Sequence, residues 1–138
     1  MYEITIEDTF ASAHQLVGYE GPCENIHGHT WKVEVSLKGD NLDKLGMLFD
    51  FKKAKNVLKD ILSGFDHKNL NELKYFVKEN PTAENIARTI YDLYSDKMKI
   101  VGAPCLPAGR IHEPPSQSPY LSKVTVWESE TTCATYSL

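Results

Sequence analysis

Hydrophobic and polar residues alternate in four stretches of the chain. In the first stretch, Tyr2, Ile4, Ile6 and Phe10 fall on one parity, with polar side chains between them. A period of two residues is typical of a strand with one buried face. The stretches with this period, each predicted to form a strand, are residues 2–14, 31–38, 124–127 and 134–138.

Two other stretches repeat their apolar residues every three or four positions, which predicts amphipathic helices. The first helix is expected to follow Asp50, a favourable N-cap residue, and to end at Ser63-Gly64. The second is expected to begin at Asn80-Pro81-Thr82 and to run to about Lys97. The predicted inward-facing residues are Phe51, Ala54, Val57, Leu58, Ile61, Leu62 and Phe65 in the first helix and Ala83, Ile86, Ala87, Ile90, Leu93 and Tyr94 in the second.

The elements follow one another as strand, strand, helix, helix, strand, strand. Segregated strands and helices are typical of the α+β class, here a four-stranded antiparallel sheet with two helices packed on one face and a more polar opposite face. A length of 138 residues predicts a single domain over residues 1–138. Residues 99–119 hold five of the seven prolines and show no period, so a long Pro-rich surface loop is expected at about 99–119.

Composition excludes several classes of protein. With 41% apolar and 25% charged residues, a net charge of -4 and no block of Lys and Arg, the chain lacks the electrostatic footprint of a nucleic-acid-binding protein. Neither a signal peptide nor a membrane span is expected, because the chain starts directly on a strand pattern and no apolar run approaches about 18 residues. Cys23, Cys105 and Cys133 are odd in number and widely spaced, which favours a reducing compartment, the cytoplasm.

Three histidines give the strongest chemical signal. His27 and His29 lie two residues apart in a predicted extended segment and so point to the same side, and His14 can join them from an antiparallel neighbour. Three neutral imidazoles suit Zn²⁺ and leave a fourth coordination position open. The spacing alone equally allows a polar strand entry with a buried, hydrogen-bonded His14.

Cys23 precedes His27 by four residues and has three interpretations. It could be the fourth ligand of a closed structural zinc site, a thiolate base or nucleophile beside a cation, or an inert loop cysteine. The spacing does not choose among them.

Four further residues carry weaker signals. The adjacent Asp66 and His67 could share a proton relay or simply occupy a solvated turn. Glu128 has the buried parity of its strand, although a strand that simply emerges into solvent is the more frequent explanation for such a residue. Thr82 has the position of a helix-cap hydroxyl.

Taken together, the chain resembles the 6-pyruvoyltetrahydropterin synthase and 6-carboxytetrahydropterin synthase family, whose members have the tunnelling fold, or T-fold. The segment at residues 99–119 departs from the family pattern. The motifs that carry the resemblance are, in chain order, Phe10-Ala-Ser-Ala-His14, Cys23-Glu-Asn-Ile-His27-Gly-His29, Phe49-Asp-Phe51, Asp66-His67 followed by Leu70-Asn71, Pro81-Thr82-Ala-Glu84-Asn85 and Val126-Trp-Glu128.

The resemblance implies roles for these residues. His14, His27 and His29 would hold a catalytic Zn²⁺, and Cys23 would be the base that abstracts a proton rather than a ligand. Asp66 and His67 would form a relay, to which Glu128 is sometimes added. Glu128 would chiefly anchor the N–H edge of the pterin through a bidentate carboxylate contact. Thr82 is expected to contribute to substrate binding.

The resemblance also implies a reaction and an assembly. The substrate would be 7,8-dihydroneopterin triphosphate, and the favoured reaction yields 6-carboxy-5,6,7,8-tetrahydropterin with release of acetaldehyde and triphosphate, on the route to queuosine. The alternatives are elimination of triphosphate to 6-pyruvoyltetrahydropterin, a pterin enzyme with a changed substrate, and a non-catalytic structural-zinc binding module. Sheets of several subunits would join into a barrel, as a homohexamer built from two trimers with sites at subunit interfaces.

Overall fold

The computed structural model describes residues 1–100 and 119–138. Its order of elements is the predicted one, with single turns of 3-10 helix in the connections. The strands and helices are β1 (Tyr2–His14), β2 (His27–Gly39), α1 (Phe51–Ser63), α2 (Ala83–Ile100), β3 (Tyr120–Trp127) and β4 (Cys133–Ser137).

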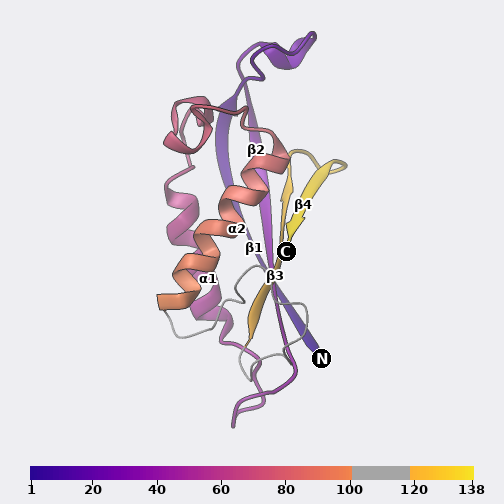
Figure 1. Ribbon diagram of the computed structural model, residues 1–138, viewed down its shortest axis with the longest axis vertical. Helices are drawn as coiled ribbons and strands as arrows, with labels where there is room; N and C mark the ends of the chain where they lie inside the picture. Colours follow the sequence, from indigo (N-terminus) through magenta and orange to yellow (C-terminus); the bar gives the residue numbers. More distant parts are fainter. Residues whose placement is uncertain (101–118) are drawn as a thin grey trace.

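The four strands form one antiparallel sheet in the order β1-β2-β3-β4, with both helices on one face (Figure 1). The long hairpin of β1 and β2 pairs Tyr2 with Gly39 at one end and His14 with His27 at the other. The apolar parity of each strand faces the helices, and Trp31, for example, is fully buried there. The predicted α+β sheet and its buried face are therefore confirmed.

Helix α1 begins and ends where the sequence predicts. The Asp50 side chain accepts hydrogen bonds from the backbone N–H groups of Lys52, at 2.7 Å, and Lys53, and Gly64 follows the last turn. The prediction that Phe51 faces the core is wrong, since its side chain is 56% exposed. Helical side chains lean toward the N-terminus, so the first residue of a helix points past its own start.

Helix α2 ends at Ile100, three residues beyond the predicted end, so the first two residues of the expected loop at 99–119 belong to this helix. Residues 101–118 of that loop lie outside the described residues. The two helices are joined by the buried Tyr94 hydroxyl, which donates to the Ala54 carbonyl at 3.1 Å. Over the described part of the chain, every helix is too short or too polar to cross a membrane.

Candidate active site

Three imidazoles gather where β1 ends and β2 begins. His14 and His27 are directly opposite each other across the hairpin, and His29 lies one pleat further along β2. The ring centroids are 4.6 Å apart for His14 and His27, 4.8 Å for His27 and His29, and 5.2 Å for His14 and His29. The antiparallel register therefore brings together the three histidines that the sequence singled out.

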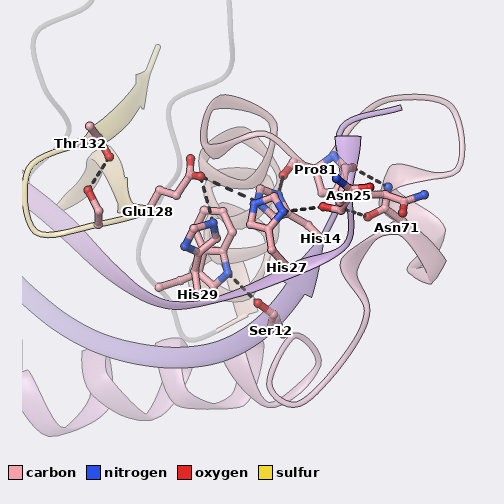
Figure 2. Close-up of polar contacts among 12 residues, drawn as sticks. Ser12, His14, Asn25, His27, His29, Asn71, Pro81, Glu128 and Thr132 are labelled. Carbon is pink, nitrogen blue, oxygen red and sulfur yellow. Dashed lines mark hydrogen bonds and ion pairs between the residues drawn. The ribbon is translucent and has the colours of Figure 1, made fainter. Parts of the chain in front are cut away.

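Backbone carbonyls orient two of these rings. Nδ1 of His14 lies 2.8 Å from the Pro81 carbonyl oxygen, and Nδ1 of His27 lies 2.7 Å from the carbonyl oxygen of Asn25 (Figure 2). A carbonyl can only accept, so both Nδ1 atoms carry the proton and donate. In the neutral rings, the electron pair is then on Nε2, which is the arrangement that a metal-binding histidine needs.

The carboxylate of Glu128, which follows the last residue of β3, closes the group. Its Oε1 atom lies 3.1 Å from Nε2 of His29 and 3.8 Å from Nε2 of His14 (Figure 2). Although both contacts are within ion-pair distance, neither Nε2 atom makes a hydrogen bond, and both atoms are buried. One potential ligand atom from each of the three histidines and Glu128 lies within 4.8 Å of the others.

This donor set fits a cation. Burial lowers the pKa of His14, against the opposing effect of its bond to Pro81, so this ring favours the neutral form. The unprotonated Nε2 of His14 and the Oε1 atom of Glu128 face each other and repel unless positive charge lies between them. Imidazole and carboxylate ligands in a small cluster suit Zn²⁺ and other first-row divalent metals.

Trp31 supports the cluster from the buried side. Its indole ring meets His14 and His29 edge-on, with centroid distances of 4.9 and 5.2 Å, and is fully buried. Its Nε1 donates to the Ser12 carbonyl oxygen at 3.3 Å. A large side chain that is itself held by a hydrogen bond limits the freedom of the histidine rings.

Cys23 lies in the single 3-10 turn Pro22–Glu24, on the segment that extends beyond the end of the sheet between β1 and β2 (Figure 1). Its thiol is free and partly buried. The group of converging ligand atoms found among the described residues does not include Cys23. Cys23 is therefore close to His27 in the sequence, but its thiol is not part of the histidine cluster.

Asp66 and His67 form a contact pair at the outer edge of β1. Nδ1 of His67 lies 2.8 Å from Oδ2 of Asp66, and Oδ1 of Asp66 accepts from the Ala11 backbone N–H at 2.9 Å. These two bonds, the backbone one first, lower the pKa of Asp66. His67 adopts a left-handed φ of 54° and is 83% exposed, so its ring is held by one nitrogen while the other faces outward.

Thr82 takes the place that the capping interpretation predicts. Its Oγ1 atom accepts from the Asn85 backbone N–H at 3.2 Å, at the start of α2. A role in substrate binding stays a prediction. The carbonyls of Asn25 and Pro81 also belong to the site, and the sequence did not reveal them. Every residue has the same backbone carbonyl, and only the fold determines which one faces a histidine ring.

Comparisons with known proteins agree with this geometry. The profile of a family described as "6-pyruvoyl tetrahydropterin synthase" matches residues 3–138. The chain is 34% identical over 114 residues to a Haemophilus influenzae protein named 6-carboxy-5,6,7,8-tetrahydropterin synthase, covering 67% of this chain and 81% of that protein. It is 42% identical over 79 residues to a Pyrococcus furiosus protein named dihydroneopterin monophosphate aldolase, covering 57% and 62%.

A solved structure supports the same relationship. The structure of Caenorhabditis elegans 6-pyruvoyl tetrahydropterin synthase is similar to this chain with a TM-score of 0.74 and 27% identity, and the similarity covers 100% of this chain and 97% of that one. The family profile also spans nearly all of the sequence. The chain therefore belongs to the 6-pyruvoyl tetrahydropterin synthase family, a family of lyases, and has its T-fold.

Proposed function

We propose that this protein is a zinc-dependent pterin lyase that converts 7,8-dihydroneopterin triphosphate and water to 6-carboxy-5,6,7,8-tetrahydropterin, acetaldehyde and triphosphate. The observation that carries the proposal is the set of buried Nε2 atoms of His14 and His29, which make no hydrogen bond and lie beside a carboxylate. The relatives named as tetrahydropterin synthases support the reaction class. No redox cofactor is required, since the ring reduction is balanced by oxidation within the side chain of the same substrate.

His14, His27 and His29 would hold the Zn²⁺ through imidazole nitrogens, with the Nδ1–H groups of the first two fixed by the carbonyls of Pro81 and Asn25. When bound, Zn²⁺ would supply Lewis-acid polarisation of oxygens on the substrate side chain. The neutral state favoured for His14 by burial suits this role, because a protonated imidazole cannot bind a metal.

Cys23 would act as the base that takes a proton from the side-chain carbon of the substrate. Its position outside the group of converging ligand atoms supports a base rather than a ligand. His67, held at Nδ1 by Asp66, would return a proton to the substrate through its outward nitrogen. The hydrogen bond from the Ala11 backbone N–H to Asp66 holds this pair in place against β1.

Glu128 would bind the pterin ring, which offers a guanidine-like N–H edge to the two oxygens of a carboxylate. Its side chain is about one-third exposed, at 32%, so a ligand can reach it. Thr82 would contribute a hydroxyl to the substrate site from the start of α2. The contacts of Glu128 with His14 and His29 make a fourth ligand role its principal alternative.

Assembly would complete the site. In the part of the chain that the structure describes, β1 and β4 form the outer edges of the sheet. The edge of β1 is covered near its end, where Ala11 and Ala13 bond to residues 66–69, and no other strand of the described residues pairs with it along residues 2–10. Open edges favour pairing with other chains. We therefore propose one T-fold domain per subunit, subunit sheets joined in a trimeric barrel, and a homohexamer of two trimers with sites at subunit interfaces. The free thiols of Cys23 and Cys133 support a cytoplasmic protein.

One experiment separates the possible reactions: mass spectrometry of the products formed by zinc-loaded protein from 7,8-dihydroneopterin triphosphate. We expect 6-carboxytetrahydropterin and acetaldehyde. Formation of 6-pyruvoyltetrahydropterin would identify the elimination reaction instead. A hydroxymethylpterin released with a two-carbon aldehyde fragment would identify an aldolase, the activity in the name of the 42% identical relative. Intact substrate after prolonged incubation would contradict a role as a lyase on this triphosphate.

A further inference from the structure

Two asparagine side chains fasten the start of the segment that carries Cys23. The amide of Asn71 is bidentate on Gln15, with its Oδ1 accepting from the backbone N–H at 2.9 Å and its Nδ2 donating to the carbonyl at 2.9 Å (Figure 2). Asn80 does the same for Val17, at 2.9 and 3.0 Å. Each amide thus imitates the backbone of a neighbouring strand.

The spacing of these contacts explains how they reach Cys23. In extended chain, the backbone groups of residues 15 and 17 point to one side and those of residue 16 point to the other. The N–H of Leu16 does point away from the asparagines, because it donates to the carbonyl oxygen of Cys23 at 2.8 Å. The two amides therefore hold one side of the segment at residues 15–17, and the backbone of Cys23 is bonded to its other side.

Hydrogen bonds, rather than apolar burial, order this segment. Most apolar side chains beyond the end of β1 are exposed, with Val17 at 65%, Tyr19 at 49% and Ile26 at 57%, and Leu16 is only partly buried. So little buried apolar surface cannot fix the path of the backbone. The four amide hydrogen bonds are accordingly the principal restraint at the start of the segment.

The same residues also connect the segment to the histidine cluster. Asn80 directly precedes Pro81, whose carbonyl oxygen accepts from Nδ1 of His14 at 2.8 Å. The carbonyl of Asn80 accepts from Nδ2 of Asn85 at 2.8 Å, which fixes it to the first turn of α2. One short stretch therefore holds an imidazole of the cluster and the backbone that carries the thiol.

From this arrangement we propose that Asn71 and Asn80 are positioning residues that set the place of the Cys23 thiol relative to the histidine cluster. The inference rests on the proposed function, in which this thiol takes a proton from the substrate. Neither asparagine would touch the reacting atoms. Each would act through Gln15, Leu16 and Val17.

The test uses Asn71→Asp and Asn80→Asp. Each substitution keeps the shape and the acceptor but turns an N–H donor into a carboxylate oxygen that faces a carbonyl oxygen, so the pairing becomes repulsive. Asn71→Ala and Asn80→Ala, which remove both bonds without repulsion, are the second pair should an aspartate variant fail to fold. Asn56→Asp, on an exposed position of α1, is the matched control for the added charge.

Five measurements are made on the zinc-loaded chain of residues 1–138: amide exchange, cysteine alkylation, steady-state kinetics, zinc content and oligomer size. Relative to wild type, we expect exchange of the backbone amides of residues 15–25 to quicken by on the order of tenfold, as the loss of one or two hydrogen bonds implies. Alkylation of Cys23 by iodoacetamide, followed on its own peptide, should quicken as well. The value of kcat should fall by about tenfold to a hundredfold with little change in KM, zinc content or oligomer size. Asn56→Asp should change none of these.

Two results would overturn the inference: unchanged exchange of residues 15–25 in the variants, or faster exchange with an unchanged kcat. Simultaneous loss of zinc, oligomer size and activity in both the aspartate and the alanine variant of one asparagine would show a general structural role for that residue. This result would also count against the inference. If the wild-type protein turns over no pterin triphosphate, the proposed function fails, and the exchange and alkylation rates alone decide whether the two amides position Cys23.

Discussion

Ser12→Ala tests whether β1 holds the turn that carries Asp66 and His67. The Ser12 hydroxyl is buried, donates to the carbonyl oxygen of Phe65 and accepts from the backbone N–H of Lys68 at 3.4 Å. Its two partners flank Asp66 and His67 in sequence. The hydroxyl thus fixes the backbone on both sides of the proposed relay.

The size of the effect follows from the two bonds that are lost. The carbonyl of Phe65 is buried, and a buried acceptor left without a partner costs about 1 to 3 kcal/mol. The Lys68 bond is long and its residue is exposed, so water can replace the hydroxyl there at little cost. We therefore expect the free energy of unfolding to fall by about 1 to 3 kcal/mol, with the loosened turn lowering kcat while zinc content is retained.

The assay compares urea unfolding and steady-state kinetics at one fixed protein concentration, since an oligomer's stability depends on it. Ser36→Ala is the matched control, because Ser36 is an equally buried strand serine whose hydroxyl bonds to that of Thr5 at 2.9 Å, away from the turn. It should lose stability and keep kcat. Equal kcat values for Ser12→Ala and Ser36→Ala, or no loss of stability in Ser12→Ala, would show that the Ser12 hydroxyl does not hold the turn.

Three further outcomes are expected. The pKa of Asp66 is lower in the folded chain, so the unfolded chain binds the extra proton, and the stability that this carboxylate adds is present above about pH 4 and is lost as the pH falls through the folded pKa. The free energies of urea unfolding of wild type and Asp66→Asn should therefore converge in acid. A difference that persists in acid would argue against a stabilising Asp66 carboxylate. Glu128→Gln should raise KM and keep zinc, whereas loss of zinc would make Glu128 a ligand. Cys23→Ala should keep zinc and lose about a hundredfold to ten-thousandfold in turnover; retained turnover would exclude the thiol as the base.

The strands and helices could be predicted because their signals are periodic and local. The alternation of residues 2–14 gave β1 its bounds, and Asp50 and Gly64 delimit α1 as their side-chain and backbone preferences require. Phe51 shows the limit of such a pattern, since periodicity identifies the side of a helix but not whether another element covers its first turn. The end of α2 at Ile100 likewise lies three residues beyond the predicted end.

The sequence predicts those parts of the candidate site that depend on strand parity and register. His14, His27 and His29 share the parity of the buried face, so pairing of two strands was enough to bring them together. The carbonyl of Pro81 and the amides of Asn71 and Asn80 depend instead on contacts between segments more than 50 residues apart, as Asn71 and Gln15 show. No local pattern encodes such contacts, and the side chains involved are ordinary in turns.

X-ray absorption at the zinc edge would show whether three imidazoles hold a zinc ion and leave a coordination position open. The sample is full-length protein loaded with one equivalent of Zn²⁺ and freed of excess metal. We expect retained zinc with a shell of nitrogen and oxygen atoms at about 2.0 to 2.1 Å, imidazole scattering and no sulfur. A sulfur shell at about 2.3 Å would make Cys23 a ligand of a closed site, and protein that retains no zinc would contradict the metal centre itself.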